Sequence, residues 1–153
     1  MILPAQTIRK LQPITPFHER TVHLGMSFGL SHAGYDVRIA ESVPLSPFTP
    51  FSLASTMEHF DIPNDVIAFV HDKSTWARRG LSLFNTVIEP GWRGYLTLEL
   101  VYNGTQALWI QAGDPIAQIV FMRLEEPTDA PYTGKYQNQC AGAVPAIMEG
   151  KDD

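Results

Sequence analysis

The segment 72–94 concentrates side chains that could bind and process a small anion. Three cations and two hydroxyls precede a turn, and two carboxylates, Glu89 and Glu99, follow. Cationic side chains hold phosphate, and a carboxylate can move a proton. These residue types therefore predict a site for a phosphate-bearing ligand with acid–base chemistry beside it. The cationic and hydroxyl side chains are Lys73, Ser74, Thr75, Arg78 and Arg79.

Glu99 lies in the middle of an expected strand, 95–102. Side chains alternate along a strand, so we expect one face to be a leucine core and the other to project Glu99 together with Thr97. Burial would raise the pKa of Glu99 and suit it to proton transfer near neutral pH. The alternative is a half-exposed glutamate on a solvated face. The expected core face is Leu96, Leu98, Leu100 and Tyr102, and the opposite face is Tyr95, Thr97, Glu99 and Val101.

Residues 74–80 are predicted to form a short helix that a glycine ends. Ser74 and Arg78 are spaced i, i+4 and would share a face, and Ser74 or Asp72 could cap the first turn. Free N–H groups there, with Lys73 and Arg78, would make an anion site. The alternative is a surface turn with scattered charges.

Three further charged residues carry weaker hypotheses. Glu89 precedes a Pro-Gly turn, where it could contact a sugar hydroxyl, activate water or simply satisfy backbone donors. Asp36 and Arg38 lie two residues apart in an expected strand, so they point to the same side and are predicted to form a structural ion pair.

Composition limits the kinds of function. With 153 residues the chain is expected to be one domain, and its net charge of −5 argues against a nucleic-acid binder. It has no long apolar run and no signal-peptide pattern at its start, so we expect a cytoplasmic protein without a membrane segment. The single cysteine, Cys140, and five histidines without metal-site spacing argue against zinc.

Twelve Pro and eleven Gly break the chain into short apolar or alternating runs, which favours an antiparallel β-barrel or sandwich with few helices. The only other helix expected is 4–11. Residues 125–140 are polar and are expected to form a mobile tail that closes over the site. The expected strands are 22–28, 35–39, 66–70, 81–84, 95–102, 107–110 and 116–124.

In order along the chain, six segments resemble motifs of the dCTP deaminase/dUTPase superfamily, and more closely of its dCTP deaminase branch. They are SHAGYDVRI, KSTWARRGL, TVIEPGWRG, LTLELVYNG, PIAQIVF and GKYQNQCAGAV. The resemblance implies a single domain over 1–153, a distorted antiparallel β-barrel or jelly-roll of the dUTPase-like type. It further implies a homotrimer with active sites between subunits, and a C-terminal lid over 125–153.

The resemblance also implies roles for individual residues. Glu99 matches the catalytic glutamate, and Ser74 and Arg78 match its partners near the reacting base. Lys73 and Thr75 match phosphate-binding positions, Glu89 the position beneath the deoxyribose, and Thr97 and Leu98 the positions that flank the base. Tyr132, Lys135 and Gln139 match nucleotide-contacting positions of the lid.

The implied reaction is hydrolytic deamination of dCTP to dUTP, without a metal at the reacting carbon. Glu99 would be the general acid and base, and Mg²⁺ would be bound through the triphosphate rather than by side chains. The alternatives are a dUTP diphosphatase, an enzyme that performs both steps, or a non-catalytic nucleotide binder. Because the family often responds to dTTP, dTTP is a further expected partner, as an inhibitor.

The chain departs from the family pattern at three places. Lys73 stands where Arg is usual, Glu89 stands where Asp is usual, and the loop from Gly80 to Pro90 is shorter. Lysine keeps the charge of arginine but lacks its two-pronged donor geometry.

Overall fold

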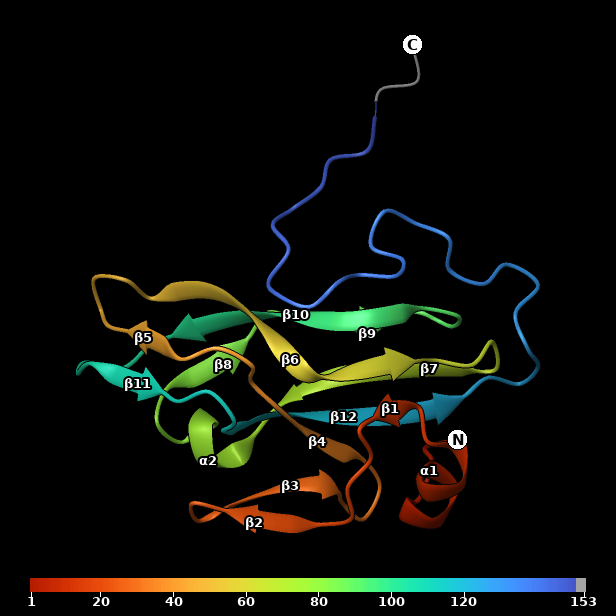
Figure 1. Ribbon diagram of the computed structural model, residues 1–153, viewed down its shortest axis with the longest axis horizontal. Coiled ribbons are helices and arrows are strands. Elements are labelled where there is room, and N and C mark those ends of the chain that lie inside the picture. Colours follow the sequence, from red (N-terminus) through yellow and green to blue (C-terminus); the bar gives the residue numbers. More distant parts are fainter. Residues whose placement is uncertain (151–153) are drawn as a thin grey trace.

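The computed structural model describes residues 1–150, which form three antiparallel sheets and two short helices (Figure 1). The six-stranded sheet has the order β2 (Thr21–His23), β3 (Met26–Leu30), β4 (Tyr35–Arg38), β12 (Pro115–Arg123), β7 (Val66–Asp72) and β9 (Val87–Ile88). The four-stranded sheet has the order β1 (Ile14–Thr15), β6 (Phe51–Asp61), β10 (Arg93–Tyr102) and β8 (Leu81–Leu83). β11 (Leu108–Ile110) pairs with β5 (Val43–Leu45). The mainly β architecture with few short helices is confirmed.

The sheets curl around a core built from the inward faces of their strands (Figure 1). Alternation places one residue in two inside, so β12 buries Ile119 and Phe121 while Gln118 and Val120 stay partly exposed. The large side chains of Tyr35, Phe60 and Phe121 are fully buried. Burial raises the pKa of the Tyr35 phenol to about 12, and its hydroxyl accepts a hydrogen bond from the His18 N–H at 2.9 Å.

The longest strand, β6, was not among the expected strands. Its sequence carries Ser55, Thr56 and Glu58, which break the apolar alternation, yet all three are buried. Glu58 is tolerated because Arg38 donates to it twice, from Nε at 2.8 Å and from its backbone N–H at 2.9 Å. The predicted pairing of Asp36 with Arg38 is therefore wrong.

Both expected helices are present. α1 spans Ala5–Leu11, and α2 spans Ser74–Ala77, with Gly80 at φ +89° ending that segment. The expected cap of α2 is wrong: Lys73 is the N-cap residue, and no side chain caps the turn. The helix is held instead by Trp76, which is buried and donates its indole N–H to the Pro115 carbonyl at 2.7 Å.

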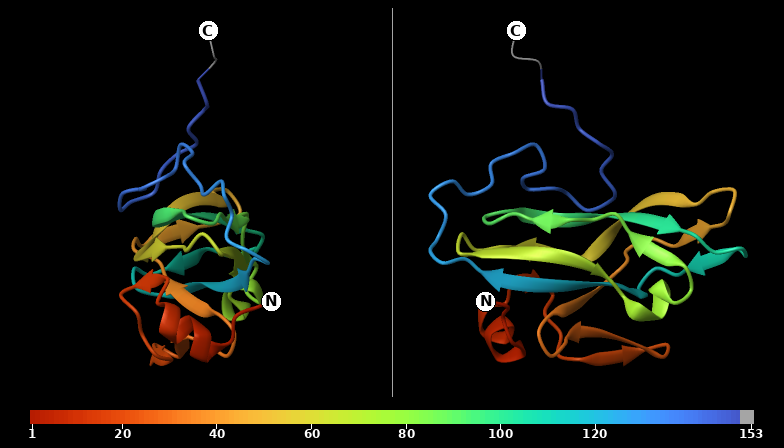
Figure 2. Two further views of the ribbon diagram at one scale, coloured as in Figure 1. Left: turned by 90° about the vertical axis from the view of Figure 1, so that its right-hand side faces the viewer. Right: turned by 180° about the vertical axis from the view of Figure 1, so that it is seen from behind.

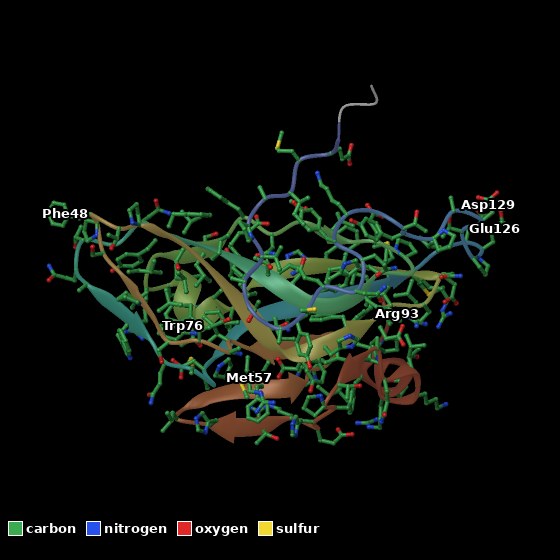
Figure 3. The ribbon with its side chains drawn as sticks, turned by 45° about the horizontal axis from the view of Figure 1, so that its top comes forward. Phe48, Met57, Trp76, Arg93, Glu126 and Asp129 are labelled. Carbon is green, nitrogen blue, oxygen red and sulfur yellow. The ribbon has the colours of Figure 1, made fainter. Side chains whose placement is uncertain are left out.

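After β12 the chain has no further strand or helix among the described residues, but it turns back across the four-stranded sheet. Figure 2 shows this tail over β10, on the side of the molecule away from the β2–β3 hairpin. Figure 3 places Glu126 and Asp129 at the end of the molecule where Arg93 begins β10, opposite Phe48. Within the described residues, no helix is long and apolar enough to cross a membrane.

Candidate functional site

A cavity of about 580 Å³ lies between β10, the loop that follows β8, and the tail. Two carboxylates, Glu89 and Glu99, line it, and so do Thr97, Tyr132 and Gln139. The structure therefore brings together five of the predicted site residues, from three separate stretches of the chain. The rest of the wall is mainly apolar and consists of Phe51, Leu53, Asn85, Thr86, Val87, Ile88, Trp92, Leu96, Tyr136, Val144 and Ala146.

A bulge in β10 decides which side chains reach this cavity. The pairing with β6 shifts register between Tyr95 and Thr97. Because a bulge interrupts strict alternation, Leu96, which packs against the core as predicted, also lines the cavity together with Thr97 and Glu99. Leu98 is fully buried, and its side chain is not part of the lining of this cavity.

The tail is joined to the cavity wall through Thr97. The Thr97 hydroxyl accepts hydrogen bonds from Gln139 Nε2 at 2.7 Å and from the Val144 N–H at 3.1 Å. Gln139 Nε2 also donates to the Tyr95 carbonyl at 2.8 Å. Gly94 allows this close approach, because a Cβ there would lie 2.7 Å from the Gln139 nitrogen.

A second group of contacts holds the tail against the loop at 89–92. The Trp92 indole donates to the Tyr136 carbonyl at 2.7 Å, and the Tyr132 N–H donates to the Pro90 carbonyl at 2.8 Å. Tyr132 and Tyr136 both line the cavity, so these bonds fix two phenols in its wall. Trp92 and Tyr136 were not predicted site residues, although both lie inside the motifs quoted above. Lys135, which was predicted, is not part of the cavity lining, and its ammonium lies 5.4 Å from the centre of the Tyr136 ring.

A second cavity, of about 530 Å³, lies between α1, the β2–β3 hairpin and the start of α2. Lys73 and Ser74 line it, together with Arg20 and Asp36. Lys73 is buried, and its ammonium donates to Asp36 Oδ2 at 2.8 Å. Burial raises the pKa of Asp36, although the hydrogen bond from Lys73 opposes that shift. Asp36 Oδ1 is buried and has no hydrogen-bond partner.

Within one chain, the predicted catalytic residues are not assembled. Glu99 lines the first cavity and Ser74 the second, while the exposed Arg78 and Thr75 line neither. No group of three or more His, Cys, Asp or Glu side chains in residues 1–150 is arranged to hold a metal ion. A single chain thus offers an acidic cavity beneath the tail and, on another face, a cavity with a buried ion pair.

Residues 37–124 match the profile of the dCTP deaminase-like family. The chain belongs to this family. A dCTP deaminase of Campylobacter hominis is 34% identical over 169 aligned positions, which cover 90% of this chain and 89% of that protein. A dCTP deaminase of Acidobacterium capsulatum is 34% identical and covers 88% of this chain and 91% of that protein. Both alignments are longer than the 153 residues here, so these relatives carry internal segments that this chain lacks.

Solved structures of the superfamily share the fold. The dCTP deaminase of Agrobacterium tumefaciens superposes with a TM-score of 0.58 at 19% identity, over 78% of this chain and 47% of that one. The dUTPase of Staphylococcus bacteriophage 80alpha, solved with dUPNHPP, gives 0.57 at 17% identity, over 78% and 84%. The predicted membership in the dCTP deaminase branch and the predicted dUTPase-like fold are confirmed.

Proposed function

We propose that this protein hydrolyses dCTP to dUTP and ammonia, with Glu99 as the general acid and base. The observation that supports this reaction best is the position of Glu99. It projects from the middle of β10 into a cavity that the tail covers, in a chain of the dCTP deaminase-like family. A carboxylate at a covered, largely apolar wall can both accept and return a proton.

The proposed reaction needs two proton transfers at one carbon. Glu99 accepts a proton from water, whose oxygen bonds to C4 of cytosine. It then gives a proton to the 4-amino group, and the C4–N bond breaks to release ammonia. The proton of the new C4 hydroxyl moves to N3, which leaves the C4 carbonyl of uracil. Acid–base transfer of this kind supplies a rate factor of ~10²–10⁴. Orientation of water and base within the covered cavity must supply much of the remainder.

We further propose that the protein is a homotrimer whose active sites lie between subunits. Ser74 and Arg78 of one subunit would face Glu99 of its neighbour and act on water and developing charge. Lys73 and Thr75 would bind phosphate. Support comes from the exposure of Ser74, Thr75 and Arg78 in the single chain, which leaves them available to a neighbouring copy. Glu89, Thr97, Tyr132, Lys135 and Gln139 would contact the nucleotide.

Mg²⁺ would arrive with the triphosphate, because this ion is usually bound through substrate phosphates. A dUTPase of the S. aureus phage phi11 is described with a structural Mg(II) ion, so a protein of this fold can hold Mg²⁺. Bound Mg²⁺ would neutralise phosphate charge, and it usually keeps several waters and one or two carboxylates. The buried, unpartnered Asp36 Oδ1 beside Lys73 is an acceptor that fits such an ion or its waters. No step at the pyrimidine ring involves the metal in this proposal.

The test measures ammonia release from dCTP by the wild type and by Glu99→Gln. Glutamine keeps the shape of the side chain but cannot accept the proton, so we expect turnover to fall ~10²–10⁴-fold while nucleotide binding persists. Normal turnover by Glu99→Gln would show that another group is the base. Tight binding without any turnover in the wild type would favour a non-catalytic nucleotide binder.

Mixing two inactive variants tests the shared site. If Glu99 and Ser74 meet between subunits, remixed trimers of Glu99→Gln and Ser74→Ala contain some interfaces with both native residues. Random mixing in equal amounts predicts about a quarter of wild-type activity. Each variant alone, remixed with itself, is the control. No recovery in mixtures whose subunits are shown to exchange would mean that the two residues do not meet across an interface.

The second candidate function is hydrolysis of dUTP to dUMP and diphosphate, alone or after deamination. Glu89 favours it, because this exposed carboxylate lines the same cavity and could activate a second water. Product analysis with dCTP, dCMP and dUTP distinguishes the cases: accumulation of dUTP supports the deaminase, and dUMP with diphosphate supports the diphosphatase. Adding dTTP to the same assay tests the expected inhibition.

A further inference from the structure

The edge of β10 beside Glu99 is completed by a side chain instead of a strand. β8 pairs with β10 through Leu83 opposite Leu100, and one more backbone bond joins the Phe84 N–H to the Glu99 carbonyl at 2.9 Å. Beyond that point the main chain leaves β10. The Asn85 side chain then donates from Nδ2 to the Thr97 carbonyl at 2.8 Å, and its Oδ1 accepts from the Glu99 N–H at 2.8 Å.

These two bonds fix the orientation of the Asn85 carboxamide. Its oxygen must face the N–H of Glu99 and its nitrogen the carbonyl of Thr97, so only one arrangement of the amide satisfies both partners. The carboxamide thus does what the peptide group of a paired strand would do. The main chain is free to diverge, and residues 85–89 form a wall of the cavity into which Glu99 projects.

We propose that Asn85 is the positioning residue of the catalytic glutamate. It holds the peptide units on both sides of Leu98, and so fixes the base of the Glu99 side chain while leaving space for the pyrimidine. This inference rests on the proposed role of Glu99. It assigns Asn85 no contact with the reacting atoms: its effect is transmitted through the backbone of β10.

A neutral amide is the group that this place requires. Besides Glu99, the titratable groups of the same chain that line the cavity are Glu89, Tyr132 and Tyr136. Aspartate at 85 would keep the acceptor for the Glu99 N–H, but it would lose the donor to the Thr97 carbonyl. Its carboxylate would instead face the Thr97 carbonyl oxygen, so two acceptors would lie where one hydrogen bond now forms.

The experiment compares kcat and KM for dCTP in the wild type, Asn85→Ala, Asn85→Asp and Thr56→Val. The last is a matched control, because the Thr56 hydroxyl accepts from the Leu96 N–H at 3.1 Å on the other edge of the same strand. We expect kcat of Asn85→Ala to fall about 10- to 100-fold, with KM much less affected. We expect kcat of Asn85→Asp to fall as well, because a carboxylate cannot donate to the Thr97 carbonyl. Thr56→Val should lose thermal stability but keep most of its kcat.

Amide hydrogen exchange at Glu99 gives a readout that does not depend on turnover. The Glu99 N–H should exchange slowly in the wild type and much faster in Asn85→Ala. Wild-type kcat in Asn85→Ala, or equal losses of kcat in Asn85→Ala and Thr56→Val, would overturn the positioning role. Fast exchange at Glu99 in the wild type would overturn the contact itself. No ammonia from the wild type would instead refute the proposed function and, with it, any catalytic role for Asn85.

Discussion

Replacing Thr97 by valine should loosen the tail without unfolding the domain. Valine keeps the shape of threonine but removes the hydroxyl that accepts from Gln139 Nε2 and from the Val144 N–H. Each such bond contributes about 0.5–1.5 kcal/mol net, so the two together stabilise the docked tail by about 1–3 kcal/mol. Since 1.4 kcal/mol corresponds to a factor of ten, the opening constant of the tail should rise about 5- to 150-fold.

Hydrogen exchange of the Gln139 and Val144 amides, with limited proteolysis of the tail, measures this opening. Thr128→Val is the matched control, because the Thr128 hydroxyl accepts from the Ala130 N–H within the tail itself and does not join the tail to β10. The control should leave exchange at Gln139 and Val144 unchanged. We also expect Thr97→Val to raise KM for dCTP, because the docked tail covers the cavity that the nucleotide would occupy.

Two results would refute this reasoning. Unchanged exchange at both amides in Thr97→Val would show that the hydroxyl does not hold the tail. A large fall in the melting temperature of the whole domain would show that Thr97 supports the sheet instead, since the opening of a tail is a local event.

Two further predictions concern buried polar contacts. Lys73→Met leaves Asp36 buried without its cation and should cost about 3–5 kcal/mol near neutral pH. Burial already raises the pKa of Asp36, and losing Lys73 raises it further. The loss of unfolding free energy in Lys73→Met therefore develops as pH rises from the ordinary aspartate pKa of 3.8 through the raised pKa of Asp36, and it shrinks in acid. Urea unfolding at about pH 7 and about pH 4 measures this difference. Equal losses at both pH values would contradict the ion-pair account. Trp92→Phe keeps a ring against Phe60 but loses the hydrogen bond to the Tyr136 carbonyl. Urea unfolding should therefore show that the free energy of unfolding falls by about 1–3 kcal/mol. Wild-type stability in this variant would mean that the bond contributes nothing.

The strand interpretation succeeded where apolar residues alternate without interruption and turn residues mark both ends. The segment 116–124 is β12 to within one residue at each end, and 66–70 lies inside β7. β6 was missed because its buried positions include Ser55, Thr56 and Glu58. Their partners are Glu41, the Leu96 N–H and Arg38, respectively, which cannot be identified from local sequence. For the same reason the partner of Asp36 was misassigned: it is Lys73, 37 positions away.

The candidate site likewise contains some residues that the sequence could predict and others that it could not. The type and spacing of Glu89, Thr97 and Glu99 were enough to nominate them, and all three line one cavity. A simple alternating pattern could not show the bulge between Tyr95 and Thr97, so the position of Leu96 in the cavity wall was not predicted. The sequence pattern did not indicate a role for Asn85 either. Its proposed role depends on two hydrogen bonds to the backbone of β10, a strand that it contacts only in the folded protein.

The sequence by itself determined the family, the mainly β fold and the identity of the proposed proton-transfer group, because these depend on residue types in a fixed order and on alternation within short segments. Only the tertiary structure decided which of those residues share a cavity. It separated Ser74 from Glu99 within one chain and docked Gln139 against Thr97. The physical reason is that hydrogen bonds and ion pairs between distant segments form only where the packing of the sheets places donor and acceptor within about 3 Å of each other.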